Sequence, residues 1–193
     1  MNRAWQRMLS GRRLDILCPS PLDIEISDIA HGLSFLARWN GQTTGKFPVS
    51  VAYHSLLVEE IFALESHNAV WRLVALLHDS PEFVIGDMIS PVKGKIGKAY
   101  EKLETDILSS IHIRFGLPTV VPDYIKLKIK KADKAAAWIE ATQMAGFSEN
   151  EANKVFGPQK NEFVRVYKCD IRSPLETRKN FIKRHKKLLA KIK

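Results

Sequence analysis

Apolar residues recur along most of the chain three or four positions apart, which is the spacing of an amphipathic helix. No pair of alternating strands is visible, and no Asn-Gly or Asp-Gly turn lies between two such strands. Glycine and proline separate the periodic segments. The pattern predicts an all-α fold with helices over residues 27–39, 51–64, 69–79, 98–115, 122–144, 148–155 and 173–192.

Four segments lack this pattern. Residues 1–25 hold a glycine, two prolines and few periodic apolar positions, so we expect an irregular N-terminal arm. Loops are expected over 40–48 and 86–97. The stretch 157–171 is ambiguous, because several of its apolar residues could form a short strand. The organisation expected is a single helical domain over 26–193 that follows the arm.

Two serines mark predicted helix boundaries. Ser50 can act as the N-cap of the helix that begins at Val51. Proline disfavours the α conformation in the residue before it, so the third helix should end near Ser80. Ser80-Pro81-Glu82 also has the pattern of a new helix start, with an N-cap, a proline at the first helical position and an acid in the first turn.

The composition is that of a globular protein. The 193 residues are 45% hydrophobic and 26% charged, which excludes a wholly disordered or collagen-like chain. The two cysteines, Cys18 and Cys169, are too few for a disulfide framework and fit a reducing compartment. No run of about 18 apolar residues is present, and no apolar segment follows the basic N-terminus. These features predict a cytoplasmic protein without membrane association.

The net charge of +9 is concentrated at the C-terminus, where residues 178–193 include eight Lys or Arg residues and no acid. Such basicity favours anionic partners such as phosphates, nucleic acid or acidic lipid. A solvated helix face explains the same pattern at least as well. We therefore expect weak nucleic-acid binding or none.

Costly polar residues interrupt three apolar helix faces. His78-Asp79 ends an apolar segment, and on its own this pair favours a structural role. His54 shares a predicted helix face with valine and isoleucine, and Asp133 shares one with isoleucine and alanine. A lone histidine on such a face is usually a satisfied core residue. A single shared cation would satisfy all of these residues at once.

The predicted ligand set therefore comprises two imidazoles and two carboxylates: His54, His78, Asp79 and Asp133. This donor set suits one divalent ion of Mn, Fe, Co, Ni or Zn better than Mg. A coordination number of five or six would leave room for a water molecule, which is the potential nucleophile.

The order of these residues resembles the H…HD…D motif of the HD-domain metal-dependent phosphohydrolases. Residues 78–93, HDSPEFVIGDMISPVK, are similar to the HDxxE…GD…PVK signature of the bacterial HD-domain 5′-deoxynucleotidases. Arg38-Trp39 matches the Arg-Trp pair of that family. The resemblance covers residues 26–140. It implies an HD-domain helical bundle that hydrolyses deoxyribonucleoside 5′-monophosphates to nucleoside and phosphate.

The resemblance also implies roles for individual residues. His54, His78, Asp79 and Asp133 match the metal ligands. Glu82 matches the catalytic glutamate, which serves the attacking water or the leaving group. Arg38 matches the phosphate-binding arginine, Trp39 a residue against the sugar, and Asp87 a residue near the 3′-hydroxyl. Lys93 lies on the loop that follows and could help Arg38 to neutralise phosphate oxygens.

The residues alone leave plainer roles open. Glu82 could be only a favourable charge at a helix N-terminus. Arg38 could be a solvated surface charge, and Trp39 could simply pack on the core. His31, His67 and His112 have no partner motif, so core, surface or loop roles are favoured.

Parts of the chain also depart from the family pattern. The arm, the residues after about 145 and the loop 41–45 do not match it, which leaves the substrate unsettled. The HDxGK lysine of the cyclic-dinucleotide phosphodiesterases is absent. Two other functions remain: a deoxynucleoside triphosphate hydrolase, and a non-catalytic HD-type module that binds nucleotide or nucleic acid. A homodimer is left open.

Overall fold

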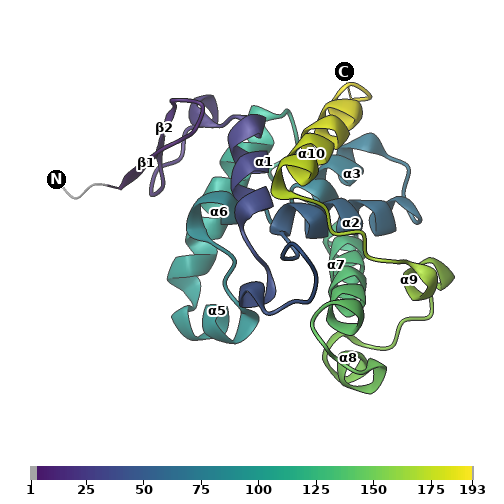
Figure 1. Ribbon diagram of the computed structural model, residues 1–193. Coiled ribbons are helices and arrows are strands. Elements are labelled where there is room, and N and C mark those ends of the chain that lie inside the picture. The colour runs from purple at the N-terminus through teal and green to yellow at the C-terminus, as the bar shows by residue number, and fades with distance from the viewer. Residues whose placement is uncertain (1–3, 193) are drawn as a thin grey trace.

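Helices make up most of the computed structural model, which describes residues 4–192 and confirms the predicted all-α class (Figure 1). Residues 1–3 of the predicted arm and residue 193 of the basic C-terminal segment lie outside the described residues. In the described range, no helix combines the length and the apolar character needed to cross a membrane. The α-helices are α1 (Ile26–Phe35), α2 (Val51–Ala63), α3 (Ala69–Leu76), α4 (Glu82–Ile85), α5 (Ser90–Ile96), α6 (Lys98–Arg114), α7 (Asp123–Gln143), α8 (Glu149–Phe156), α9 (Glu162–Val166) and α10 (Pro174–Leu189).

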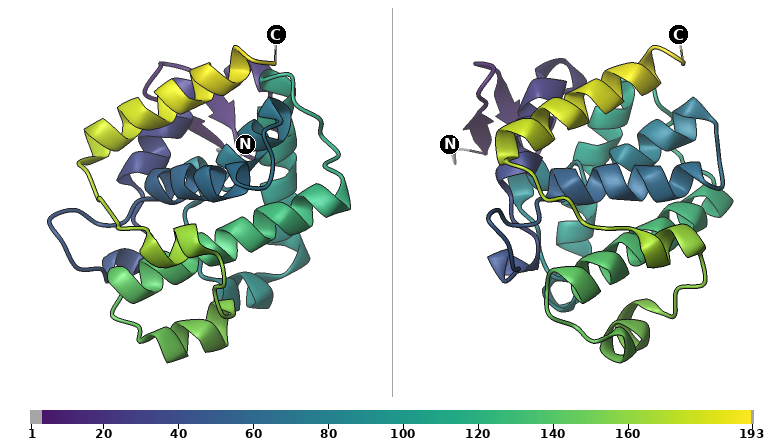
Figure 2. Two further views of the ribbon diagram at one scale, coloured as in Figure 1. Left: turned by 90° about the vertical axis from the view of Figure 1, so that its right-hand side faces the viewer. Right: turned by 45° about the vertical axis from the view of Figure 1, so that its right-hand side comes forward.

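Helix α2 lies at the centre of the fold. It packs against α1, α3, α7 and α10, and α7 and α10 lie on opposite sides of it (Figure 2). Apolar residues occur almost all round α2, as expected for a fully buried helix. The Ser50 hydroxyl accepts a hydrogen bond from the backbone N–H of Tyr53, which confirms the predicted N-cap.

The prediction of an irregular arm is wrong. Strands β1 (Trp5–Arg7) and β2 (Arg13–Asp15) form an antiparallel hairpin that projects from the helices, and a 3₁₀ helix, η1 (Pro21–Asp23), follows it (Figure 1). Tertiary contacts hold this hairpin. Leu14 is buried in the core, and the backbone N–H and hydroxyl of Ser10 donate to the Asp28 carboxylate on α1. Strands of three residues are too short to show the alternation that identifies a strand in the sequence.

Two further segments differ from expectation. The predicted loop 86–97 contains the seven-residue helix α5, between two glycines with positive φ, Gly86 at 82° and Gly97 at 71°. The ambiguous stretch forms α9 rather than a strand, with the Asn161 side chain as its N-cap. Both helices have at most two turns, which is too short for a clear periodic pattern.

Helix boundaries near the predicted ligands also differ. The first helix ends at Phe35 rather than at residue 39, and the third at Leu76 rather than at residue 79. Ser80 is not the N-cap of α4. Pro81 is, and the Ser80 hydroxyl donates to the Leu77 carbonyl instead. His78-Asp79 therefore lies in a turn between α3 and α4.

Close packing of α1 against α4 fixes the position of the segment that carries Glu82. A Cβ atom at Gly32 would lie 2.9 Å from the Cβ and the carbonyl oxygen of Phe83. Because backbone cannot easily yield, we expect Gly32→Ala to lower the free energy of unfolding by about 1–3 kcal/mol in urea titrations. Gly94→Ala in α5 is the matched control, since its Cβ meets nothing within 4 Å. Equal effects of the two substitutions would contradict this packing.

A buried histidine predicts how stability depends on pH. The His185 ring packs edge-on to Phe115 with centroids 4.5 Å apart, and burial lowers the pKa of His185 to about 4. The unfolded chain therefore takes up this proton more readily, so stability should fall as the pH drops from about 6.5 towards 4. His185→Phe should reduce the difference in unfolding free energy between pH 7 and pH 5. An unchanged difference would contradict the assignment.

Candidate metal centre

Three elements bring the four predicted ligands together. His54 lies on α2 and Asp133 on α7, and the packing of these helices places His54 Nε2 3.2 Å from Asp133 Oδ1. The turn after α3 supplies His78 and Asp79. The Oδ2 atom of Asp79 is 3.1 Å from His78 Nε2 and 3.7 Å from His54 Nε2.

The donor atoms are close enough to share one ion. Ligand atoms of His54, His78 and Asp133 all lie within 4.8 Å of one another, and Asp79 contacts both imidazoles. These residues could therefore hold a metal ion.

Hydrogen bonds set the orientation of both imidazoles. His54 Nδ1 is 2.7 Å from Glu140 Oε1, and His78 Nδ1 is 2.9 Å from the Ala75 carbonyl oxygen. These acceptors favour a proton on each Nδ1, so Nε2 is the ring atom that could bind a cation. Among the described residues, neither Nε2 atom has a hydrogen-bond partner, although both are buried. Two buried imidazole lone pairs that face two carboxylates fit a bound cation.

Both carboxylates of the set are ionised. Burial raises the pKa of Asp79, but protonated His78 and His54 lower it by more, so that it lies well below its usual range. Burial also raises the pKa of Asp133, and His54, His78 and Lys130 outweigh it. Lys130 Nζ donates to Asp133 Oδ2 at 2.7 Å.

Burial and the charge of Arg38 lower the pKa of His54, but Glu140 and Asp133 outweigh them and raise it to about 9. A cation bound between the two carboxylates would replace the proton that His54 then carries on Nε2.

Glu140, which is not among the predicted site residues, orients His54 and its neighbours by hydrogen bonds. Its Oε1 atom accepts from His54, and its Oε2 atom accepts from Arg38 Nε at 2.9 Å and from Trp39 Nε1 at 3.0 Å. Burial raises the pKa of Glu140, but Arg38 and His54 lower it to about 2. A signal was present in the sequence, because Glu140 lies seven residues after Asp133 and so shares its helix face.

The Arg38-Trp39 pair reaches Glu140 through an unusual backbone. The Arg38 N–H donates to the Val49 carbonyl, and Trp39 and Asn40 then adopt φ values of 57° and 50°. Positive φ is rare for a bulky residue and marks local strain. The Trp39 ring lies edge-on to two phenylalanines, with the Phe147 centroid 5.6 Å away. Trp39 thus packs on the core as well, and its predicted sugar contact stays a prediction.

Glu82 and Lys93 line a polar cavity of about 290 Å³ that also includes His78 and Asp79. Glu82 is buried, and Lys93 Nζ lies 3.3 Å from its Oε1 and 2.8 Å from Glu104 Oε1. Burial, together with the charges of Asp79 and Asp87, raises the pKa of Glu82 to about 8. A carboxyl group with such a pKa can both accept and release a proton near neutral pH.

The charges of the site also affect the pKa of Asp87. Burial raises its pKa, and the charge of Arg38 opposes this increase. Its predicted contact with the sugar 3′-hydroxyl stays a prediction.

A second, larger cavity of about 700 Å³ adjoins the same centre. His78, Asp79 and Asp133 line one wall, and apolar side chains line much of the rest: Val74, Leu108, Val120, Val121 and Ile129. The two cavities share His78 and Asp79. The ligand set therefore stands between a polar and a largely apolar compartment.

Comparison with known proteins identifies a relative, but the name of that relative states no activity. No family model matches the chain. The chain is 57% identical over 194 aligned residues to an uncharacterized protein of Rhodobacter capsulatus, and the match covers 100% of this chain and 99% of that protein. The chain therefore belongs to the same family as this Rhodobacter capsulatus protein.

Proposed function

We propose that this protein is a metal-dependent phosphohydrolase with an HD-type helical fold, and that it hydrolyses deoxyribonucleoside 5′-monophosphates. The observation that carries the proposal is the pair of buried Nε2 atoms of His54 and His78, which have no hydrogen-bond partner in the described part of the chain and face Asp79 and Asp133. The order of these residues in the chain, and its resemblance to the HD-domain 5′-deoxynucleotidases, support the same conclusion.

The four ligands would hold one divalent ion. A set of two imidazoles and two carboxylates favours Mn, Fe, Co, Ni or Zn over Mg. When bound, such an ion polarises a phosphoryl oxygen and lowers the pKa of a coordinated water. Glu140 and the Ala75 carbonyl hold the imidazoles in the tautomer that this role requires.

The protein supplies the proton transfer and the charge around the phosphate. Glu82 takes a proton from the attacking water and delivers it to the leaving 5′-oxygen, for which its raised pKa is suited. Arg38, whose Nη1 lies 3.9 Å from Asp79 Oδ2, supplies a fixed positive charge beside the ligand set. Lys93 adds a second positive charge and orients Glu82.

The two cavities suggest how the substrate lies. The polar cavity, with Glu82 and Lys93, would receive the phosphate, and the larger apolar cavity would receive the base. The net charge of +9 favours a more highly charged substrate, so a deoxynucleoside triphosphate is the alternative.

A nucleotide screen tests the proposal. Purified protein is freed of metal with a chelator, reloaded with Mn, Co, Zn or Mg, and assayed with deoxyribonucleoside and ribonucleoside mono-, di- and triphosphates. We expect phosphate release from deoxyribonucleoside monophosphates that disappears with the chelator and returns with a transition metal. Undiminished turnover after verified metal removal would overturn the proposal.

A further inference from the structure

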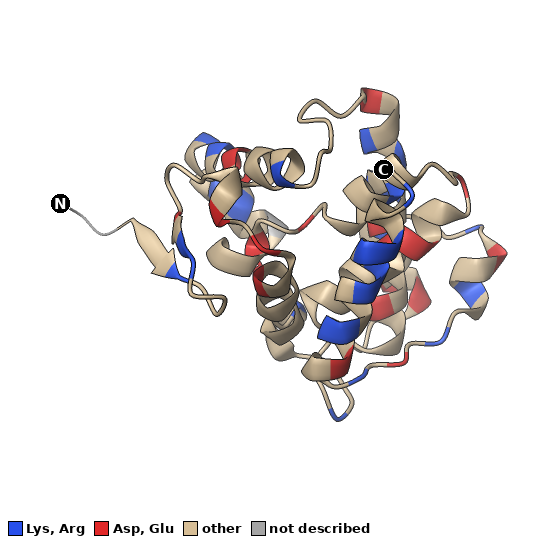
Figure 3. Cartoon of the chain, turned by 90° about the horizontal axis from the view of Figure 1, so that it is seen from above, with Lys and Arg blue, Asp and Glu red and all other residues tan. Residues whose placement is uncertain are grey.

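The basic helix α10, which leads to the C-terminus and carries several Lys and Arg residues (Figure 3), has more positive charge than its neighbours neutralise. Among the described basic residues of this helix, Arg184 is alone in forming an ion pair, with Glu59 on α2. Glu59 is fully buried and also accepts a hydrogen bond from Arg72 Nε at 2.6 Å. Two guanidinium groups therefore share one carboxylate, and one positive charge remains in excess.

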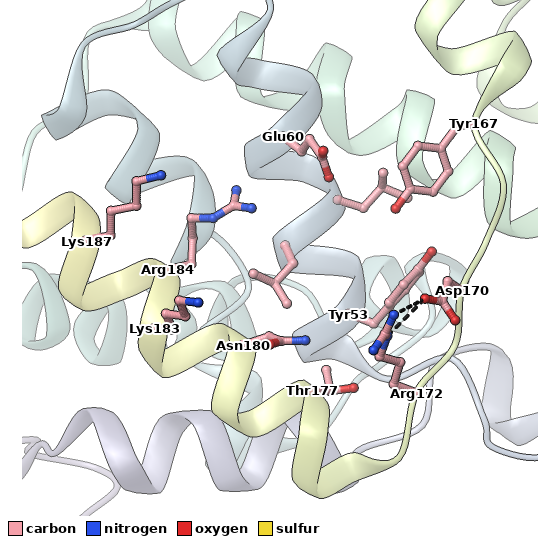
Figure 4. A pocket seen from close by; sticks show the side chains of 12 residues that line it. Tyr53, Glu60, Tyr167, Asp170, Arg172, Thr177, Asn180, Lys183, Arg184 and Lys187 are labelled. Atoms are coloured by element: carbon pink, nitrogen blue, oxygen red, sulfur yellow. Dashed lines mark hydrogen bonds and ion pairs between the residues drawn. The ribbon is translucent and has the colours of Figure 1, made fainter.

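This excess charge borders a pocket of about 390 Å³ between α10, α2 and the segment that leads into α10 (Figure 4). Lys183, Arg184 and Lys187 project from α10 toward α2 along one side of it. Their positions i, i+1 and i+4 place them on neighbouring parts of one helix face. The pair with Glu59 holds Arg184 in place, whereas Lys183 and Lys187 are exposed.

The opposite side of the pocket is partly aromatic. Tyr53 from α2 and Tyr167 from the segment before α10 lie there, and leucines of α2 complete the apolar surface (Figure 4). Two acids also border the pocket. Asp170 is bound by Arg172 at 2.6 Å, which leaves the Glu60 carboxylate as an acceptor for a hydroxyl or amine donor.

The pocket is separate from the metal centre. The residues that line it include none of the proposed metal ligands and none that line the two cavities beside them. Tyr53 precedes His54 in the chain, and successive residues of a helix point to different sides. A ligand here would therefore lie on another side of α2 from the ligand set.

We propose that this pocket binds a small phosphorylated ligand of nucleotide size. Lys183, Arg184 and Lys187 would bind the phosphate by charge-assisted hydrogen bonds. The two tyrosines would contact the organic part, and Glu60 would accept from one of its hydroxyl groups. The volume lies in the range of small-molecule sites. The inference does not depend on the proposed hydrolysis.

The test is a titration of the full chain with ADP in the presence of a chelator, so that hydrolysis is suppressed. Backbone amide signals of Thr177 and Asn180, two pocket residues on α10, report binding at this place. We expect saturable shifts of these signals. The double variant Lys183→Glu with Lys187→Glu should weaken binding at least tenfold, because it reverses two of the positive charges that bind the phosphate.

The matched control is Lys179→Glu with Lys186→Glu, which makes the same charge change at two exposed positions of α10 outside the pocket. This variant should bind ADP within about twofold of the wild type. Equal losses in both double variants would show general attraction to a basic helix and would overturn the proposal. Unshifted Thr177 and Asn180 signals at millimolar ADP would also overturn it. So would tight DNA or RNA binding that ADP does not displace, since the face would then be a nucleic-acid surface.

Discussion

Glu82→Gln should retain its metal but lose about 10²–10⁴-fold in turnover on the best nucleotide, because the substitution removes the group that moves the proton. The amide keeps the shape of the side chain and leaves all four proposed ligands in place. Lys93 loses one of its two negatively charged partners but keeps Glu104, at 2.8 Å. The KM should change little, since Glu82 serves the water or the leaving group rather than the phosphate.

Asp79→Asn is the comparison that separates a catalytic group from a ligand. Its Oδ2 atom lies near both imidazoles, so removal of its charge should lower metal content and turnover together. Metal per chain and turnover are measured for both variants. If Glu82→Gln loses its metal, then Glu82 is a ligand. If it keeps full turnover, then Glu82 is only an acid at the start of α4 and another group moves the proton.

Glu140→Gln should weaken metal binding by about 10–100-fold, although Glu140 is not among the proposed ligands. The neutral amide no longer stabilises the Nδ1 proton of His54 as the carboxylate does. It also leaves Arg38 without its principal counter-charge in a buried position. We therefore expect the free energy of unfolding to fall by about 3–5 kcal/mol.

Glu104→Gln is the matched control for this prediction. Glu104 is a partly exposed acid that pairs with Lys93 at the edge of the polar cavity, and it contacts none of the proposed ligands in the described structure. Its loss should change stability by less than about 1 kcal/mol and leave metal affinity unchanged. Metal titration and urea unfolding of both variants check the prediction. Similar metal affinities for the two variants would show that Glu140 does not support the centre.

The convergence of the ligands could be predicted because His54 and Asp133 interrupt apolar helix faces and His78-Asp79 ends an apolar segment. His54 is buried and Asp133 half-buried, at a cost that the sequence reveals, and the structure places them 3.2 Å apart. Glu140 is also a costly polar residue on an apolar helix face. The cost of burying its carboxylate is offset by hydrogen bonds from His54, Arg38 and Trp39, which lie far from it in the chain. Which segments meet it depends on tertiary packing, which periodicity does not encode.

The same distinction applies to the fold. Long helices such as α6 and α7 hold enough turns for the 3.6-residue period to be evident. The hairpin, α5 and α9 depend on contacts with the rest of the chain, such as the bond from Ser10 to Asp28. The turn that carries His78-Asp79 looked like the continuation of α3, because Leu76 and Leu77 are core residues on either side of its end.

Helix α7 fixes the distance between two residues of the metal centre. Asp133 and the residue that orients His54 stand seven positions apart in one uninterrupted helix, which separates them by about 10 Å along its axis on nearly the same face. Inserting one residue between them would turn one relative to the other by about 100°. The length of this interval should therefore be as constrained as the identity of the residues at its two ends.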